Sequence, residues 1–296
     1  DKPKNWTSFD VVKIVRKLSG EKKIGHAGTL DKLATGLMIL ALGEATKFLE
    51  YLIGFDKEYE VKLKFGAISE TYDAEGPIKE VDGFNAGKVM KKAFEKDVLG
   101  KISAQINGGF LGEIMQIPPR YSALKIAGRR ASDRVRGGEK IEMKARKIKI
   151  YKFEILSFGW PEAYFRVNCG SGTYVRSLVH DLGQCLGWGA YVLELRRTKI
   201  GNFGIESAVD LSKNIEQQLV SIEAFIRSKN FDGCEIMELD DLEFLALKDG
   251  GVLLGKKVEQ GCFVVALYKG GVVGILESFG GGIKFQKRIV GDMLKN

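Results

Sequence analysis

The sequence predicts an α+β fold in which a mixed, largely antiparallel central sheet is followed by a small β-barrel-like module. Residues 57–65 alternate between apolar and charged side chains, the pattern of a strand with one buried face. Segments 8–18 and 175–186 instead place apolar residues at helical spacing. Residues 231–296 contain short apolar runs separated by glycines, which favours a compact β module. Because no regular βαβ repeat occurs, α+β is favoured over a doubly wound sheet.

The first half of the chain begins with a predicted helix. Ser8 is a residue type that caps helices, and Gly20 lies just past the last apolar position. Residues 33–42 form a second apolar segment, of helical character, that ends before Gly43. The alternating strand at 57–65 follows, and it places Tyr59 on the apolar face together with Val61, Leu63 and Phe65.

The second half continues with strands and a long helix. A polar helical stretch is predicted near residues 88–94, and two adjacent prolines at 118–119 indicate a stiff, exposed connection. Residues 144–158 and 163–169 are predicted strands, and the helix at 175–186 comes after a Gly-Ser-Gly turn. A polar, helix-like connector at 211–228 leads to the terminal module. We therefore expect two domains, over residues 1–228 and 231–296.

Composition limits the class of protein. Hydrophobic residues make up 45% and charged residues 28% of the 296 residues, so a sizeable core is expected rather than disorder. No run approaches 18 apolar residues and no signal-peptide core is present, which predicts a cytoplasmic protein with no membrane partner. The four cysteines form no Cys-x-x-Cys pair, and only two histidines occur. This pattern argues against a structural zinc site and fits a reducing compartment.

Positive charge is concentrated in one segment. Residues 120–152 contain twelve Lys or Arg and three Asp or Glu, a local balance of +9 against +8 for the whole chain. Such a concentration is the electrostatic pattern of a phosphate-binding surface. A solvated charged face remains the alternative when the charge run is taken alone.

Three residues are candidates for chemistry, and two of them, Asp31 and Tyr59, have a simpler structural interpretation. Asp31 lies in a glycine-rich run, residues 25–36, and an aspartate before an apolar helical segment is usually an N-cap. Tyr59 taken alone is a core tyrosine. Arg176 falls in the first turn of its predicted helix, where the helix dipole disfavours a cation by about 0.3–1 kcal/mol. A nearby carboxylate would explain that position, because a guanidinium binds a carboxylate in a bidentate manner.

Taken together, the motifs resemble those of the TruB-type tRNA pseudouridine synthases. Residues 25–36 are similar to the family signature Gly-His-x-Gly-x-Leu-Asp-Pro-x-Ala-x-Gly, with Lys32 in place of proline. Residues 2–8 are similar to the first family motif, with Asn5 in place of glycine. Further matches are Lys57-Glu58-Tyr59-Glu60-Val61, Thr71-Tyr72-Asp73-x-x-Gly76 and Gly172-Thr173-Tyr174-Val175-Arg176. The resemblance spans about residues 1–205.

The resemblance implies roles for five residues. Asp31 would be the catalytic aspartate, Tyr59 would stack on the target base, and Arg176 would pair with the aspartate. His26 would fill space near the flipped nucleotides rather than act as a general base, and a structural histidine is the alternative. Leu195 would line the same pocket, although an ordinary core leucine fits equally well.

Two further segments resemble RNA-binding parts of the family. Gln116 to Gly128 carries the full hallmark Gln-x-Pro-Pro-x-Tyr-Ser-Ala-x-Lys-x-x-Gly of the family's RNA-clasping insertion, expected over about residues 115–147. The terminal module is similar to a PUA domain, a small RNA-binding barrel. The RNA-binding residues implied for the insertion are Arg120, Lys125, Arg129, Arg130, Lys144 and Lys147.

The implied activity is isomerisation of uridine 55 in the TΨC loop of tRNA to pseudouridine. The reaction breaks the C1′–N1 bond and rejoins the uracil through C5, so neither a cofactor nor a metal is expected. The implied partner is the T stem-loop of tRNA, and the chain is expected to be a monomer. A guide-RNA-dependent relative and a non-catalytic RNA-binding protein of the same fold remain alternatives. A glycoside hydrolase would need a second carboxylate, for which Glu44 and Asp73 are the candidates.

Overall fold

The architecture is organised around a seven-stranded sheet. The computed structural model describes residues 1–81, 92–209, 211, 215, 218–228, 234–258 and 263–289. The strand order is β13-β12-β4-β11-β10-β7 with antiparallel neighbours, and β2 pairs in parallel with β12. The strands are β2 (Thr35–Gly36), β4 (Lys57–Phe65), β7 (Gly112–Gln116), β10 (Arg146–Gly159), β11 (Glu162–Cys169), β12 (Ala190–Ile200) and β13 (Phe203–Gly204). The expectation of a mixed, largely antiparallel sheet is confirmed.

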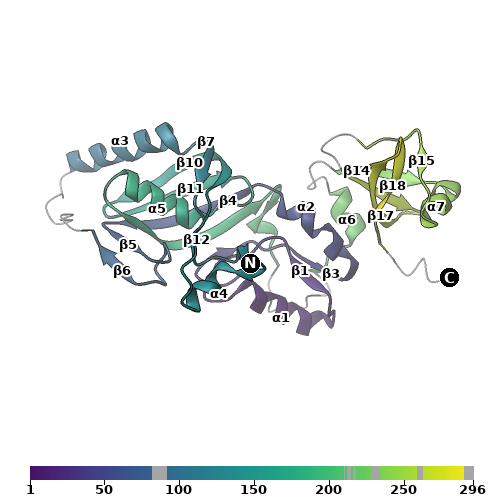
Figure 1. Cartoon of the computed structure of the whole chain (residues 1–296), viewed down its shortest axis with the longest axis horizontal. Coiled ribbons are helices and arrows are strands. Elements are labelled where there is room, and N and C mark those ends of the chain that lie inside the picture. Colours follow the sequence, from purple (N-terminus) through teal and green to yellow (C-terminus); the bar gives the residue numbers. More distant parts are fainter. Residues whose placement is uncertain are drawn as a thin grey trace.

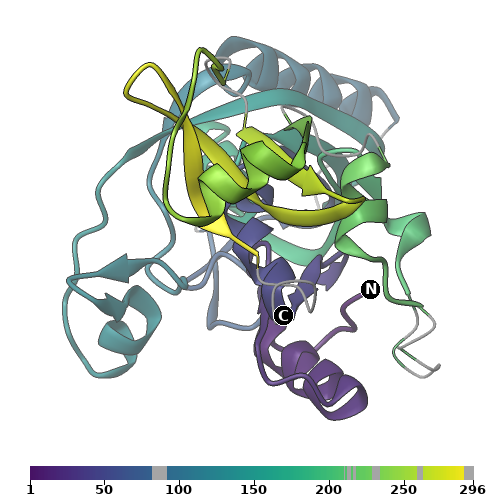
Figure 2. The ribbon, with the colours of Figure 1, turned by 90° about the vertical axis from the view of Figure 1, so that its right-hand side faces the viewer.

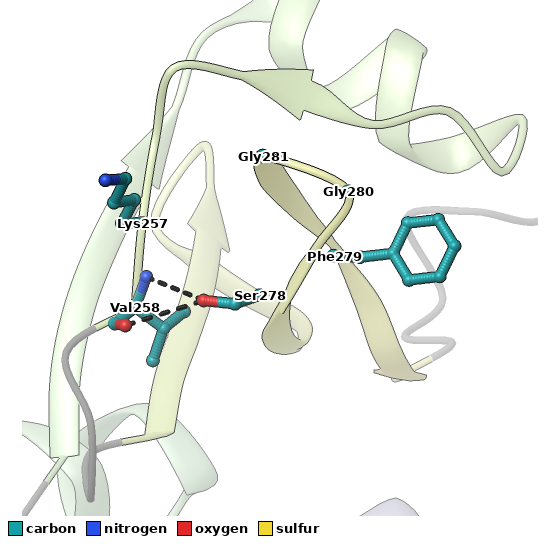
Figure 3. A pocket seen from close by; sticks show the side chains of 7 residues that line it. Lys257, Val258, Ser278, Phe279, Gly280 and Gly281 are labelled. Atoms are coloured by element: carbon teal, nitrogen blue, oxygen red, sulfur yellow. Dashed lines mark hydrogen bonds between the residues drawn. The ribbon is translucent and has the colours of Figure 1, made fainter.

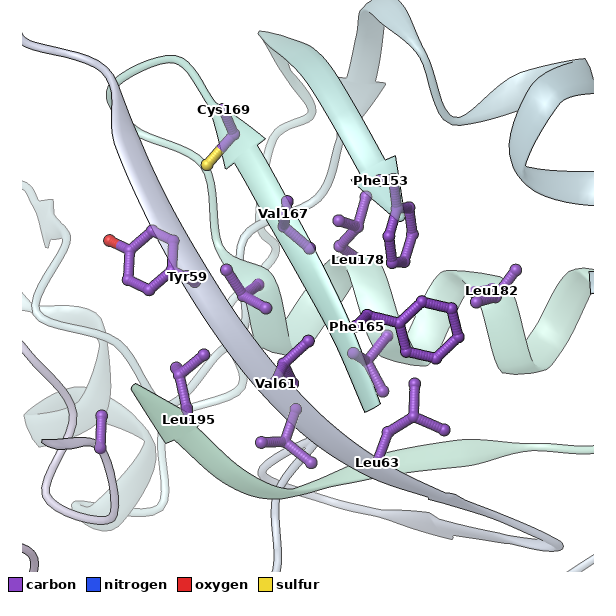
Figure 4. Packing of buried hydrophobic residues seen from close by; sticks show 14 of the residues in the cluster. Tyr59, Val61, Leu63, Phe153, Phe165, Val167, Cys169, Leu178, Leu182 and Leu195 are labelled. Carbon is purple, nitrogen blue, oxygen red and sulfur yellow. The ribbon is translucent and has the colours of Figure 1, made fainter. Parts of the chain in front are cut away.

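Two helices cover one face of this sheet, α3 (Lys92–Gly109) and α5 (Val175–Cys185) (Figure 1). Burial along β4 alternates at every residue, as its sequence pattern predicts. Its buried apolar side chains, Tyr59 among them, share one core cluster with Leu178 and Leu182 of α5 (Figure 4). Glu58, Glu60, Lys62 and Lys64 lie on the other face of the sheet, which is partly open to solvent. Lys57 is the exception: it is buried, and its ammonium donates to Ile53 O and Phe55 O.

Smaller elements complete this part of the chain. The strands β5 (Ala67–Ser69) and β6 (Ile78–Glu80) form a hairpin, and η3 (Ile205–Ser207) follows β13. The helix predicted at 88–94 falls mostly outside the described residues, and α3 begins at Lys92. No helix among the described residues is long and apolar enough to cross a membrane.

The amino-terminal elements depart from two expectations. In α1 (Ser8–Ser19) the N-cap is Thr7, not Ser8, because Thr7 and Asp10 form a reciprocal capping box. Residues 33–42 are not helical. They form β2 and the short strand β3 (Leu40–Leu42), which pairs with β1 (Ile24–His26). The apolar side chains of this segment are buried against the sheet, and tertiary packing outweighs their helical spacing.

The predicted insertion leaves the sheet after β7 and returns at β10. It contains β8 (Lys125–Ile126), β9 (Arg129–Arg130) and α4 (Ala131–Arg136), and Figure 2 shows it projecting from the body as an arm. Its own small apolar cluster holds it together, built on Ala131, Ile141 and Met143. The prolines at 118–119 are buried, so the expectation of an exposed connection there is wrong.

The carboxyl-terminal module is a curled five-stranded sheet of order β14-β16-β17-β18-β15. Its elements are β14 (Cys234–Leu239), α7 (Asp241–Lys248), β15 (Leu253–Leu254), β16 (Phe263–Tyr268), β17 (Gly271–Phe279) and β18 (Gly282–Arg288). This half-barrel agrees with the predicted β-barrel-like module. A shallow pocket on it is lined by Lys257, Val258 and residues 278–282 (Figure 3). Within the predicted connector at 211–228, the described residues include one short helix, α6 (Ile222–Arg227).

The module lies at one end of the molecule, next to η1 (Gly43–Phe48), α2 (Leu49–Ile53) and α6 (Figure 1). One buried cluster joins the two parts, with Phe48 and Leu52 on one side and Val265 and Ile275 on the other. Ala27, between β1 and the following loop, belongs to the same cluster. The module is therefore packed against the elements that carry the glycine-rich run.

Candidate active site

Asp31 lies in the loop that connects β1 to β2. The Ser8 hydroxyl fixes the preceding residue, because its oxygen accepts from Leu30 N at 2.8 Å and donates to Leu30 O at 3.2 Å. Ala34 N donates to Asp31 O at 3.1 Å and closes a tight turn. No helix begins at Asp31, so its interpretation as an N-cap is wrong.

A fully buried arginine holds both ends of this loop. Arg197 on β12 is 1% exposed, and it donates from Nε to Leu37 O at 2.8 Å and from Nη2 to Gly28 O at 3.2 Å. Gly36 packs directly on the same strand. A Cβ there would lie 2.3 Å from Arg197 O, and its φ of 108° also requires glycine. The sequence alone assigned no role to Arg197. Its place two residues after Leu195 on the same strand is what could have pointed to it.

Lys2 fixes the other flank of the loop. Its buried ammonium donates to the carbonyl oxygens of Trp6 at 2.6 Å, Pro3 at 3.0 Å and Lys32 at 3.3 Å. Burial lowers the pKa of Lys2 to about 8, although the nearby Asp31 charge works in the opposite direction. Asn5 N also donates to Lys32 O at 3.0 Å. Both contacts hold Lys32 through its backbone carbonyl, so they do not depend on its side chain.

Asp31 and Arg176 form a bidentate ion pair. Arg176 Nε donates to Asp31 Oδ2 and Nη2 donates to Asp31 Oδ1, each at 2.8 Å, although the residues are 145 positions apart in sequence. The Arg176 side chain is only 4% exposed, whereas that of Asp31 is 33% exposed. The predicted pairing of these two residues is thus present in the structure, with the carboxylate as its accessible member.

Further acceptors complete the surroundings of the guanidinium. Arg176 Nη1 donates to Thr71 O at 2.8 Å and lies 3.2 Å from Asp73 Oδ2, and Nη2 donates to Tyr121 O at 3.0 Å. Together with the two hydrogen bonds to Asp31, these three contacts use all five N–H donors of the guanidinium. Burial disfavours its charge, but Asp31 and Asp73 outweigh that effect and raise the pKa of Arg176.

The aromatic and apolar candidates lie in the same core cluster as the loop. Tyr59 and Leu195 lie on the neighbouring strands β4 and β12 (Figure 4). Both belong to the buried cluster that also contains Leu30 and Leu33. Burial raises the pKa of Tyr59, although Arg197 works in the opposite direction, so the phenol stays neutral at physiological pH. The charge of Asp31 adds to the raised pKa of Tyr59 and of Tyr174, although burial is the larger cause for both.

His26 lies at the end of β1 and is partly buried. Burial and the Arg197 charge lower its pKa, and among the described residues its buried Nδ1 has no hydrogen-bond partner. A lowered pKa favours the neutral imidazole. The space-filling role implied by the resemblance stays a prediction. Within the described part of the chain, no hydrogen bond or ion pair joins His26 to Asp31, so nothing in the geometry favours His26 as a general base.

The insertion reaches the site through its base. The Gln116 amide donates to Tyr174 O at 3.1 Å and accepts from Tyr174 N at 2.9 Å, at the N-cap of α5. Ser177 Oγ donates to Ile117 O at 2.8 Å. The arm is therefore anchored to the first turn of the helix that carries Arg176. The six predicted RNA-binding residues are all exposed: Arg120, Lys125, Arg129, Arg130, Lys144 and Lys147. The last of them, Lys147, lies at the start of β10, where the arm returns to the sheet.

The sequence matches known proteins over most of its length. A sequence model of the TruB family pseudouridylate synthase N-terminal domain matches residues 16–175. The chain belongs to the TruB family of pseudouridylate synthases. A second model, the tRNA pseudouridylate synthase B C-terminal domain, matches residues 176–229. The two models meet between Val175 and Arg176, at the start of α5.

Curated relatives carry the same family name. The chain is 43% identical to a tRNA pseudouridine synthase B of Clostridium tetani over 262 residues, 87% of this chain and 85% of that protein. It is 39% identical to a tRNA pseudouridine synthase B of Aquifex aeolicus over 267 residues, again 87% of this chain and 85% of that protein. The matches to these relatives cover more of the chain than the two family models do.

Solved structures show the same fold. A Cbf5–Nop10–Gar1 complex aligns with a TM-score of 0.67 at 24% identity, covering 97% of this chain and 83% of the other. An archaeal box H/ACA Nop10–Cbf5 complex aligns with a TM-score of 0.64 at 25% identity, covering 97% and 84%. The alignment includes the carboxyl-terminal half-barrel, which supports its description as a PUA-like module.

One departure of this TruB-family chain from the family motifs has a physical explanation. Asn5 adopts a φ of 66°, in the left-handed region. Asparagine enters this region more readily than other non-glycine residues, so it replaces the usual glycine at modest cost. The turn before α1 therefore accommodates asparagine at this position.

Proposed function

We propose that this protein isomerises uridine 55 in the T stem-loop of tRNA to pseudouridine, acting as a cytoplasmic monomer. Its family membership and the relatives named tRNA pseudouridine synthase B support this activity. The observation that carries the assignment of catalytic residues is the bidentate ion pair between a partly exposed Asp31 and a buried Arg176. A single chain supplies all of these groups, as a monomeric enzyme requires.

The proposed division of roles follows from accessibility. Asp31 is the carboxylate that acts on the nucleotide, because the other carboxylate at the site, Asp73, is 3% exposed and faces Arg176. Arg176 holds the Asp31 carboxylate in one orientation, and fixed orientation contributes to catalysis before any chemical step. Tyr59 offers a neutral ring on which an unpaired base can stack, worth about 1–3 kcal/mol per base.

Substrate entry requires that the uridine leave its stack. Extrusion of a base costs a few kcal/mol, and favourable contacts to phosphates and to the extruded base offset this cost. The exposed basic arm, whose base is bound to α5 beside Arg176, is positioned to supply the phosphate contacts. His26 and Leu195 then border the space around the base.

The alternatives are less well supported. A glycoside hydrolase needs a second accessible carboxylate, but Asp73 is buried, and Glu44 pairs with Lys23 and Lys47. A non-catalytic RNA-binding protein would have no need for the Asp31–Arg176 pair. The guide-RNA-dependent alternative is not favoured, because the relatives at about 40% identity are named tRNA pseudouridine synthase B, whereas the Cbf5 structures share only about a quarter of their residues with this chain.

A tRNA transcript incubated with the purified protein, with no cofactor added, tests the proposal. Release of tritium from [5-³H]uridine should correspond to one modified uridine per tRNA. Mapping should then locate the pseudouridine at position 55. A transcript with cytidine at position 55 is the matched control. Modification at another position would contradict the choice of uridine 55.

The Asp31→Asn variant tests the residue assignment in the same assay. Removing the charged carboxylate while keeping its shape should abolish tritium release, whereas tRNA affinity should change by no more than about threefold. Filter binding and thermal unfolding provide the accompanying measurements. Activity within about tenfold of the wild type would remove Asp31 from the catalytic role.

A further inference from the structure

Arg176 is held on the side away from Asp31 by the loop that contains Thr71, Tyr72 and Asp73. Thr71 O accepts from the guanidinium at 2.8 Å, and Asp73 Oδ2 lies 3.2 Å from it. The Thr71 hydroxyl donates to Asp73 Oδ1 at 2.6 Å, which fixes that carboxylate within the loop. The position of this loop relative to α5 therefore determines where the guanidinium can lie.

Tyr72, at the centre of this loop, has an unfavourable backbone conformation. Its φ is 65°, in the left-handed region, and bulky residues are rarely found there. Such a conformation persists only where surrounding contacts impose it, and these positions concentrate at functional sites. Its backbone pairs with β12, where Val192 N donates to Tyr72 O at 3.0 Å. The side chain provides the second constraint.

The Tyr72 ring stacks on the imidazole of His180. The ring centroids are 3.9 Å apart and the planes are inclined by 13°. His180 lies on α5, four residues after Arg176, so the two side chains leave the same face of one helix. The loop thus contacts α5 twice, one turn apart: at Arg176 through Thr71 and Asp73, and at His180 through Tyr72.

We propose that Tyr72 and His180 are a positioning pair for the Asp31–Arg176 site, in which the ring stack fixes the acceptors of the 71–73 loop against α5. This inference rests on the proposed function. Neither ring touches the reacting groups, so the pair acts through Arg176. Loss of the stack should let the loop, and with it the guanidinium, depart from the orientation that serves Asp31, and displacements of about 1 Å can reduce rates by up to 10²-fold.

Variants that separate the ring from the backbone conformation test this pair. Tyr72→Asn removes the ring and keeps a residue that tolerates a positive φ. Tyr72→Phe keeps the ring and is the matched control, and His180→Ala removes the stack from the helix side. We expect Tyr72→Asn and His180→Ala each to slow single-turnover tritium release about tenfold, with tRNA affinity within threefold. Tyr72→Phe should match the wild type.

The double variant Tyr72→Asn/His180→Ala should be no slower than either single variant, because both remove the same contact. The Arg176 Nε–H resonance gives a readout independent of activity, and its exchange with solvent should accelerate in the two variants that lack the stack. If Tyr72→Asn fails to fold, His180→Ala tests the loss of the same ring stack from the helix side.

Three results would overturn the pair: wild-type rates in both Tyr72→Asn and His180→Ala, an equal loss in Tyr72→Phe, or a loss confined to tRNA affinity. The last would mean that the ring contacts RNA. Wild-type protein without tritium release would instead refute the proposed function, so the two failures are distinguishable.

Discussion

At the scale of single residues, the side chain of Arg176 joins four segments of the chain. It contacts the Asp31 loop, the 71–73 loop and the insertion at Tyr121 from its own place on α5. A cation in the first turn of a helix is unfavourable, and here two carboxylates compensate for it. The planar arrangement of five donors explains why the position needs arginine rather than lysine.

The Arg176→Lys variant should therefore lose activity out of proportion to its conserved charge. An ammonium has three donors and cannot form the bidentate pair, so we expect the single-turnover rate to fall by about 100-fold or more. Unsatisfied acceptors should also lower the free energy of unfolding by about 1–3 kcal/mol. Arg227→Lys, at an exposed pair with Glu238, is the control and should leave both quantities unchanged.

A second residue-level prediction concerns pH. Burial raises the pKa of Asp181 to about 6 from an ordinary value of 3.8. The folded state thus binds this proton more tightly than the unfolded state, so the ionised carboxylate costs stability above pH 6, and that cost fades as the pH falls toward 4. Asp181→Asn should raise the melting temperature at pH 8 more than at pH 4.5. An equal effect at both values would contradict it.

The capping residue Asp10 provides a comparison of opposite sign. Hydrogen bonds from Thr7 lower the pKa of this exposed carboxyl, so its contribution is present above its ordinary pKa of 3.8 and is lost as the pH falls below the lowered value. Asp10→Asn should therefore reduce the melting temperature at neutral pH and have less effect in acid. Scanning calorimetry across the two series measures both variants.

At the scale of elements, the insertion combines an anchored base with an exposed basic arm. Its base is bound to α5 through Gln116 and Ser177, and the arm has its own apolar cluster. The ion pairs along the arm, such as Arg129 with Glu139, are exposed and contribute little to stability. Its basic side chains are therefore available to phosphates at little structural cost.

Removing these charges should weaken tRNA binding without unfolding the protein. We expect Lys125→Ala, Arg130→Ala and Lys144→Ala combined to reduce the slope of log affinity against log salt by about one for each lost phosphate contact. The melting temperature should stay within about 1 °C of the wild type. Lys101→Ala on α3 is the control. An unchanged salt slope in the triple variant would remove the arm from the RNA interface.

At the scale of the whole molecule, the carboxyl-terminal module and the rest of the chain share a buried cluster. Polar contacts surround this cluster: Tyr51 Oη donates to Gln286 Oε1 at 2.5 Å, and Lys287 pairs with Glu50 at 2.5 Å. Tyr51 also stacks on Phe263, with centroids 4.2 Å apart. Because Ala27 next to His26 lies in the cluster, the module supports the same segment that leads to Asp31.

This packing predicts that the two parts unfold as one unit. Phe48→Ala on η1 and Ile275→Ala on β17 should each lower the free energy of unfolding by about 2–5 kcal/mol, and both should shift the same calorimetric transition. Leu242→Ala, an exposed position on α7, should change it by less than about 0.5 kcal/mol. Two separate transitions, each moved by one variant, would show that the module is independent.

Much of the local structure could be predicted because it depends on short-range patterns. The alternation in residues 57–65 predicted β4, helical spacing predicted α1 and α5, and glycine-separated apolar runs predicted the terminal sheet. Residues 33–42 could not be predicted in this way. Their apolar side chains fit a helix and a buried strand equally well, and pairing with β1 and β12 decides between them.

The sequence by itself determined which residue types were available for chemistry: the glycine-rich run with Asp31, the awkwardly placed Arg176 and the basic insertion. Only the tertiary structure decided that Asp31 is no helix cap, that Arg197 and Lys2 hold its loop, and that the 71–73 loop holds Arg176. The physical reason is sequence distance. These contacts join residues up to 169 positions apart, so the local periodicity of the sequence cannot predict them. They form only when the sheet brings β4, β12 and α5 together.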